Sequence, residues 1–215
     1  DAVQGAGKVP IDLKAWAAAG VDLLAISAHK FTGPAGVGAL WIRRGVTLAA
    51  TTTGGRHERN RRAGTENVLG IIGMGAAARV AREALAHISE VAALRDHLEQ
   101  SLTARISGLT VNGDIARRVA NTSNVSVAGL EAESLLIALD LEGIAVSTGA
   151  ACSSGTLEPS HVLKAMGLPR ERTRNSLRFS LGHTTTRAEI DRVITVLPAL
   201  VDKLRRLTRS IAEVK

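Results

Sequence analysis

The chain alternates short apolar runs of strand length with stretches whose apolar residues recur at three- and four-residue steps. The run from Val21 to Ser27 suits a strand, whereas the recurrence from Val80 to Ile106 is typical of amphipathic helix, either one long helix or two in tandem. Strands and helices that follow one another in this way favour an α/β fold. We therefore predict an α/β protein.

A turn signal at residues 111–114 divides the predicted elements into two sets. The first set comprises a helix at 11–20, strands at 21–27 and 39–43, and helix from 66 to 106. The second set comprises strands at 119–127, 144–147 and 177–181, and helices at 131–142, from 161 and from 186. The last helix opens with Thr186 and Glu189 spaced as a capping box, and Pro198 should kink it. We predict two domains, 1–107 and 108–215.

The composition indicates a globular protein of a reducing compartment. Of 215 residues, 45% are apolar, which is enough for a buried core. Cys152 is the only cysteine and cannot form an internal disulfide. The longest apolar run, Val68 to Ala78, falls short of the roughly 20 residues that span a bilayer, and the N-terminus shows no export pattern. We expect a cytoplasmic protein with no membrane partner.

Two other classes of site are disfavoured by the sequence. The net charge of +7 is compatible with nucleic-acid binding, but only 2% of residues are aromatic and tyrosine is absent, so bases would find few stacking partners. The six histidines show no paired spacing on a helix face, and one cysteine completes no ligand set. We predict neither nucleic-acid binding nor a metal site.

Two residues stand out as candidates for chemistry. Lys30 ends an apolar run, follows His29, and precedes a glycine-rich turn that lets backbone approach a ligand closely; a lysine at a strand end beside a turn is the plainer interpretation. Cys152 lies among small polar residues from Ser147 to Gly155, a setting that suits an exposed nucleophile, although a buried inert cysteine is the alternative.

Two further residues suit anion binding. Arg178 alternates with apolar residues on a predicted strand, where a guanidinium can bind a carboxylate through two hydrogen bonds; a salt-bridged or solvated arginine is the alternative. Thr65 lies at a predicted helix start, where free amides and the helix dipole attract anions, although it could serve only as an N-cap.

Taken in order, these residues resemble the cysteine desulfurases of the NifS/IscS type, members of the class-V aminotransferase family. The resemblance covers nearly the whole chain. It is carried by residues 1–4, 27–30, 33–38, 54–55, 62–67, 147–154, 159–163 and 176–182. It implies a fold-type I transferase dependent on pyridoxal 5'-phosphate (PLP), with a partial large domain followed by a small α+β C-terminal domain. Because the chain opens on Asp1, we expect it to be the C-terminal portion of such an enzyme.

The resemblance also implies a role for each candidate. The implied cofactor ligands are Asp1 at the pyridine nitrogen, Gln4 at the ring hydroxyl, Ser27 and His29 at the phosphate, Thr65 at the phosphate across a dimer interface, and Lys30 as the covalent attachment and proton shuttle. Arg178 would bind the substrate carboxylate, and Cys152 would accept sulfur.

The implied reaction converts L-cysteine to L-alanine and leaves a persulfide on Cys152. The persulfide would pass to an acceptor protein, such as an iron–sulfur scaffold, for iron–sulfur cluster or thio-cofactor synthesis, and the enzyme would be a homodimer. Another fold-type I enzyme, a selenocysteine lyase or a kynureninase-like enzyme, is an alternative, because fold and cofactor do not fix the reaction. The second alternative is a noncatalytic truncated scaffold.

Overall fold

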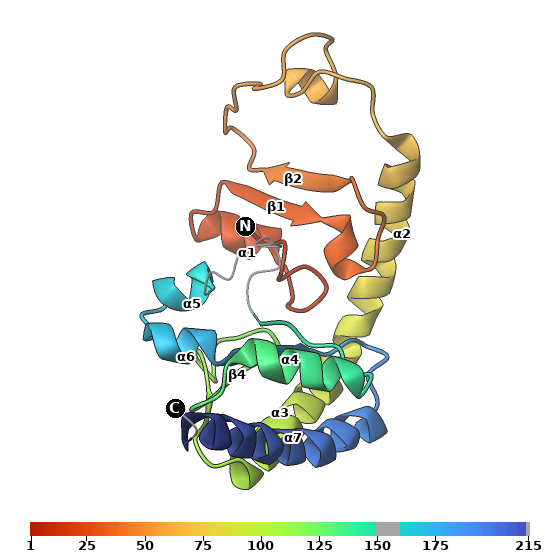
Figure 1. Ribbon diagram of the computed structural model, residues 1–215. Helices are drawn as coiled ribbons and strands as arrows, with labels where there is room; N and C mark the ends of the chain where they lie inside the picture. Colours follow the sequence, from red (N-terminus) through yellow and green to blue (C-terminus); the bar gives the residue numbers. More distant parts are fainter. Residues whose placement is uncertain (149–159, 214–215) are drawn as a thin grey trace. The chain divides into compact units, whose positions relative to one another are not determined.

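The computed structural model describes residues 1–148 and 160–213, and the chain forms two compact units, residues 1–86 and 87–215 (Figure 1). The mixed helices and strands agree with the predicted α/β class. The contacts divide the chain between Ala86 and His87; the functional domain boundary after residue 107 stays a prediction. Within the described ranges, no helix has the length and apolar character needed to cross a membrane.

The first unit is built around one two-stranded sheet. Its elements are α1 (Leu13–Ala18), β1 (Leu23–Ser27), the 3-10 turn η1 (Ala28–Phe31), β2 (Gly38–Ile42), the 3-10 turn η2 (Glu58–Asn60) and α2 (Val68–Ala84). β1 and β2 are antiparallel, with Leu23 opposite Ile42 and Ser27 opposite Gly38. The carboxylate of Asp12 caps α1 by accepting hydrogen bonds from two backbone amides.

A small core holds the first unit together. It consists of Ala6, Ala28, Phe31, Met74 and Ala77, so η1 packs against α2. A Cβ added at Gly33 would lie 2.9 Å from the Ala28 Cβ and 3.1 Å from that of Ala77. Glycine therefore allows the chain after η1 to pass close to this core.

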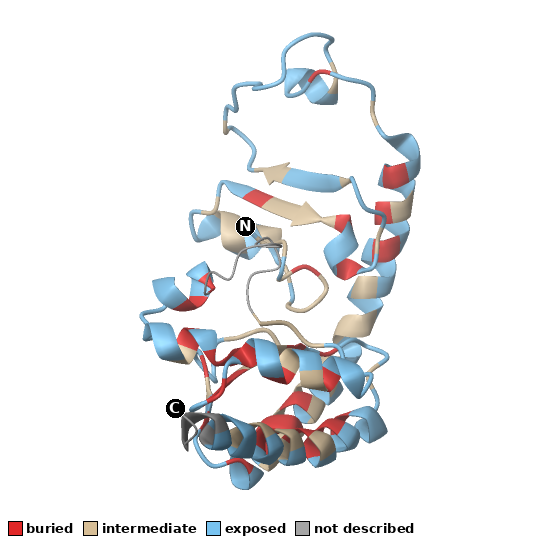
Figure 2. Cartoon of the chain, viewed as in Figure 1, coloured by how far each residue is buried: buried red, intermediate tan, exposed pale blue. Residues whose placement is uncertain are grey.

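The second unit is a three-stranded antiparallel sheet with helices. Its elements are α3 (Ile88–Arg105), β3 (Leu109–Val111), β4 (Thr122–Val127), α4 (Ala132–Leu141), α5 (His161–Ala165), α6 (Arg170–Arg174), β5 (Ser176–Ser180) and α7 (Arg187–Glu213), and the strand order is β3-β4-β5. The main core lies here, where strands, α3, α4 and α7 contribute fully buried side chains (Figure 2). They include Leu98, Val125, Leu139, Leu177 and Leu197.

The capping box predicted at the start of α7 is confirmed. The Thr186 backbone amide donates to Glu189 Oε2 (2.7 Å), and the Glu189 amide donates to Thr186 Oγ1 (3.3 Å). The predicted apolar stripe of this helix is buried at Ile190, Ile194 and Leu197. α7 runs through Pro198 as one helix.

Other local predictions need correction. The helical pattern from 66 to 106 is two helices, with the 3-10 turn η3 (Leu85–His87) between them. Residues 144–147 form no strand: their ladder contact is one isolated bridge, between Ser147 and Arg178. Neither β3 nor α6 was predicted. β3 has only three residues and α6 contains no apolar residue, so neither shows a periodicity that identifies an element.

Candidate active site

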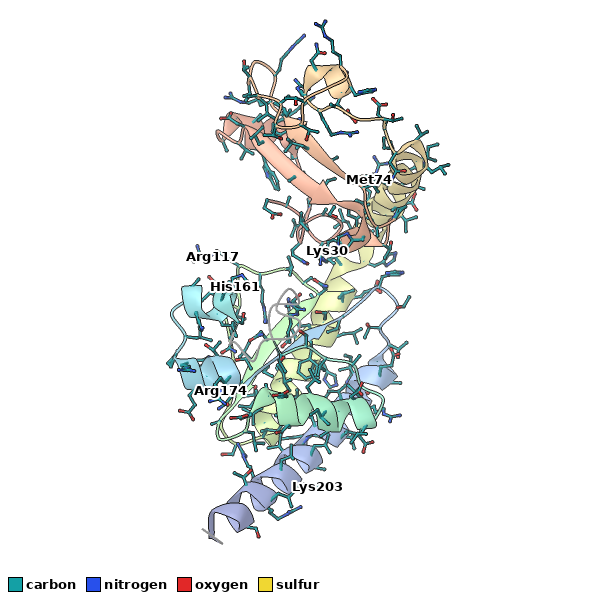
Figure 3. The ribbon with its side chains drawn as sticks, turned by 45° about the horizontal axis from the view of Figure 1, so that its top comes forward. Lys30, Met74, Arg117, His161, Arg174 and Lys203 are labelled. Carbon is teal, nitrogen blue, oxygen red and sulfur yellow. The ribbon has the colours of Figure 1, made fainter. Side chains whose placement is uncertain are left out.

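Lys30 lies in η1, directly after β1 (Figure 3). Its neighbours Ala28 and Phe31 are buried, whereas Lys30 itself is exposed. The turn ends at Thr32, whose φ of 66° is in the left-handed region. The buried pair thus fixes the backbone and leaves the Lys30 amine accessible to a ligand.

Ser27 and His29 lie beside Lys30 and contact each other. The Ser27 Oγ and the His29 Nδ1 are 2.9 Å apart. The backbone amide of Ala28 donates to the Val37 carbonyl (3.0 Å), which ties η1 to the chain just before β2. A hydroxyl and an imidazole are thus in contact at the end of β1, and the next residue carries an amine; together these are groups that suit an anion.

The segment that begins with Asp1 is far from Lys30 in sequence but contacts β1 at Ala2. The Ala2 amide donates to the Ala25 carbonyl (3.0 Å). The Asp1 carboxylate accepts from the Val3 amide (2.7 Å) and is exposed. Through Ala2, the segment that carries the predicted ligands Asp1 and Gln4 is hydrogen-bonded to the strand that leads into Ser27.

Lys8 is a residue of this region that the sequence did not single out. Its Nζ donates to the Gln4 Oε1 (3.2 Å). Burial lowers the pKa of Lys8, and the positive charge of Lys30 lowers it further. Gly7, at φ 74°, lets this turn approach Phe31, because a Cβ there would lie 3.2 Å from the Phe31 Cβ. The sequence signal that could have identified Lys8 is its position four residues after Gln4, the residue to which it donates.

Thr65 is exposed and does not cap α2. Asn67 is the N-cap, and its Oδ1 accepts from the Gly70 amide (3.0 Å). The interpretation of Thr65 as an N-cap is therefore wrong. In the described part of the chain, Thr65 makes no hydrogen bond to Ser27, His29 or Lys30.

Arg178 lies in β5, opposite Asn124 of β4. Leu177 and Phe179 are buried, Arg178 is half-buried and Ser180 is exposed, which confirms the predicted strand; Ser176, predicted on the polar face with Arg178, is buried as well. The Arg178 Nε is buried with no hydrogen-bond partner among residues 1–148 and 160–213, and no carboxylate of those residues pairs with the side chain. A buried unpaired donor is costly, so it favours an acceptor from a ligand.

The backbone of Arg178 is fixed on its other side by Ser147. The Arg178 amide donates to the Ser147 carbonyl (2.6 Å), and the Ser147 amide donates to the Arg178 carbonyl (3.1 Å). Cys152 lies outside the described residues, so its role stays a prediction. Among the described residues, no three His, Cys, Asp or Glu side chains gather as a metal site.

Comparison with known proteins identifies relatives over almost the whole chain. Residues 1–193 match the family Aminotransferase class-V. A cysteine desulfurase of Nostoc sp. is 50% identical over 212 residues, which are 97% of this chain and 52% of the relative. The chain therefore spans about half the length of the curated relatives that it matches.

Solved structures agree with the sequence matches. A NifS-like protein from Rickettsia africae superposes with a TM-score of 0.82 at 32% identity, over 94% of this chain and 52% of that one. SspA in complex with cysteine superposes with a TM-score of 0.64 at 26% identity, over 86% of this chain and 50% of that one. These matches confirm the predicted fold-type I architecture, and the chain belongs to the class-V aminotransferase family.

Proposed function

We propose that the protein containing this chain is a PLP-dependent cysteine desulfurase that converts L-cysteine to L-alanine. The observation that carries the proposal is the cluster of Ser27, His29 and Lys30 at the end of β1, in a chain about 50% identical to cysteine desulfurases. The structural neighbour SspA was solved with cysteine, which supports cysteine as the substrate.

The residues present fit PLP. Ser27 and His29 offer hydrogen bonds to a phosphate, and the exposed amine of Lys30 follows directly on the same turn. Asp1 would hold a proton at the pyridine nitrogen, and Gln4 would bind the ring hydroxyl. When bound, the cofactor supplies an electron sink for charge released at the substrate.

Three side chains of the protein would each have a separate role in the reaction. Arg178 would bind the substrate carboxylate, because its buried Nε has no acceptor among the described residues. Lys30 would move protons at the substrate's carbon atoms. Cys152 would attack the substrate sulfur as a thiolate, so that an S–S bond forms as the C–S bond breaks. The products balance as L-alanine and one persulfide on Cys152.

We propose that the enzyme is a homodimer. The N-terminal part of α2 exposes a group of large apolar side chains: Val68 at 59%, Leu69 at 84%, Ile71 at 45% and Ile72 at 65%. An apolar helix face of this kind is typical of an interface with a second subunit. Thr65 lies three residues before α2 and would serve the phosphate of the partner subunit's site.

We also propose that the persulfide passes to a sulfur-acceptor protein, such as an iron–sulfur scaffold, in the cytoplasm. The product would serve iron–sulfur cluster or thio-cofactor synthesis. The single cysteine supports a reducing compartment, because it can form no disulfide within the chain and its thiol must stay free to carry a persulfide. Pull-down of such a scaffold by the persulfide-bearing enzyme, and its loss with Cys152→Ala, would test this step.

The decisive experiment uses the full-length protein with added PLP. Cys152→Ala should abolish alanine and sulfide formation from cysteine while the visible absorbance of the bound cofactor remains. Lys30→Ala should abolish the cofactor adduct that borohydride reduction otherwise fixes to this residue, as seen by mass spectrometry. Cysteine turnover that survives Cys152→Ala would instead favour a selenocysteine lyase or kynureninase-like enzyme. A protein that stays colourless with PLP would favour a noncatalytic scaffold.

A further inference from the structure

The first unit contains a second candidate binding site, at the opposite end of the β1–β2 hairpin from Lys30. A cavity of about 560 Å³ lies beside α1 and the end of β2. Its lining includes Trp41 and Arg43, and Trp41 pairs with Leu24 near the start of β1, whereas Lys30 follows the end of β1. None of the proposed cofactor ligands lines this cavity, so it requires its own explanation.

The cavity is lined by five cationic side chains and no carboxylate. The cations are Lys14, Arg43, Arg44, Arg59 and Arg61. Arg43 forms an ion pair with Asp22 (2.6 Å), but the other four have no ion-pair partner in the part of the chain that the structure describes. Five positive charges around one cavity, with no carboxylate in its lining, would attract an anion.

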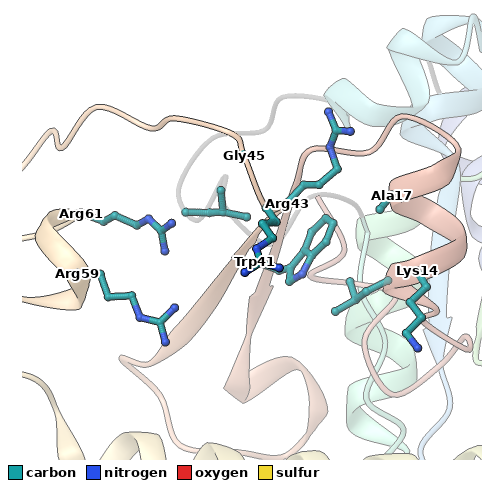
Figure 4. Close-up of a pocket in the computed structure, with 10 residues that line it drawn as sticks. Lys14, Ala17, Trp41, Arg43, Gly45, Arg59 and Arg61 are labelled. Carbon is teal, nitrogen blue, oxygen red and sulfur yellow. The ribbon is translucent and has the colours of Figure 1, made fainter.

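The backbone that presents Arg59 is strained. Glu58, Arg59 and Asn60 all have positive φ, at 48°, 58° and 63°, and none of them is glycine. Such conformations are uncommon for residues with a Cβ and concentrate at ligand sites. Figure 4 shows the side chains of Arg59 and Arg61 extending toward Trp41 and Arg43. The strained segment thus supplies two guanidinium groups to the cavity.

We propose that this cavity binds a nucleoside di- or triphosphate. Guanidinium groups bind phosphate oxygens through paired hydrogen bonds, and four unpaired cations suit two or three phosphates. The indole of Trp41 provides a flat apolar surface for the base. The volume lies in the range of small-molecule sites, roughly 300–1,000 Å³.

The test is a calorimetric titration of the full-length protein saturated with PLP, so that added anions do not report on the cofactor site. ATP should bind, inorganic pyrophosphate should compete with it, and adenosine alone should not bind. Arg59→Ala together with Arg61→Ala should weaken ATP binding by about tenfold or more. Arg79→Ala is the matched control, because Arg79 is an exposed arginine of α2 outside the cavity. Its variant should bind ATP as the unchanged protein does.

A fluorescence measurement would test whether the ligand binds at this cavity. The chain has two tryptophans, and Trp16→Phe leaves Trp41 as the reporter within it. ATP should change the Trp41 emission in Trp16→Phe, and salt should weaken binding. The proposal is overturned if ATP does not bind, if the double arginine variant binds it unchanged, or if adenosine binds equally well. Binding of an acidic peptide such as polyglutamate without binding of ATP would also overturn it, and would identify a protein-docking surface.

Discussion

The hydroxyl of Ser27 and the Nδ1 of His29 lie 2.9 Å apart, on the two sides of the buried Ala28 and next to Lys30. Because β1 ends at Ser27 and η1 begins at Ala28, the change from strand to turn places both polar side chains beside the Lys30 backbone. The two predicted phosphate ligands therefore lie next to the predicted covalent lysine.

Ser27→Ala should weaken PLP binding. Loss of one hydrogen bond to a charged phosphate costs about 1.5–3 kcal/mol, so the dissociation constant should rise about tenfold or more. Absorbance titration of the cofactor-free protein with PLP measures this change. Ser134→Ala, at an exposed position of α4, is the control and should leave the constant unchanged. Equal affinities for both variants would contradict the assignment of Ser27.

Lys30→Ala should raise the pKa of Lys8 in the cofactor-free protein, because the neighbouring positive charge that lowers it is removed. The pKa should stay below that of an ordinary lysine, since burial is the larger cause and remains. Lys30→Arg keeps the charge and should keep the lowered value. NMR titration of labelled lysine side chains measures all three proteins. A Lys8 pKa insensitive to Lys30→Ala would show that the two amines do not interact.

Two leucines of α4 should differ sharply in their effect on stability. Leu139 is fully buried in the main core, whereas Leu141 is 84% exposed. Leu139→Ala should lower the free energy of unfolding of its unit by about 2–5 kcal/mol, since it leaves a cavity. Leu141→Ala should change it by about 0.5 kcal/mol or less. Urea denaturation of the two variants provides the comparison, and similar losses would contradict this packing of α4.

Asp191 should stabilise the contact between α3 and α7 in a pH-dependent way. Its carboxylate contacts His97 (2.7 Å) and Arg187 (3.1 Å), and these hydrogen bonds lower its pKa below the ordinary value of 3.8. A lowered folded-state pKa means that the contribution is complete above the unfolded-state pKa and disappears as pH falls through the folded-state value. Asp191→Asn should thus destabilise the protein at pH 7 and hardly at all at strongly acidic pH.

Urea denaturation across this pH range tests the role of Asp191. Asp202→Asn is the control, because Asp202 is exposed on the same helix and has no ion-pair partner among the described residues. It should give no pH-dependent difference from the unchanged protein. A loss of stability from Asp191→Asn that is constant with pH would mean that the carboxylate acts through packing and not through its charge.

The sequence predicted what local pattern encodes. β1 and β5 were recognisable from apolar runs and alternation, and the α7 cap from the spacing of Thr186 and Glu189. The motif from Ser27 to Lys30 could be singled out because a lysine follows an apolar strand and precedes glycines. Each of these signals lies within a few residues of the feature that it predicts.

Features that depend on tertiary contact were not predictable. The charge of Lys8 interacts with that of Lys30 across some 22 residues of sequence, and Gly7 is where the turn before Lys8 passes close to Phe31. Asn67 caps α2 in place of Thr65, and both residue types are acceptable caps, so composition could not choose between them. Residues 144–147 read as a strand because they are apolar, but only Ser147 finds a ladder partner.

Among the described residues, the buried core beside Lys30 is small: three alanines, one phenylalanine and one methionine. Little apolar surface is thus withdrawn from water around the turn that would bind PLP, and ligand binding adds stability by mass action to whatever part it contacts. Binding of PLP should therefore lengthen the time for which residues 1–86 resist proteolysis. The second unit, with its leucine-rich core, should resist proteolysis equally well without PLP.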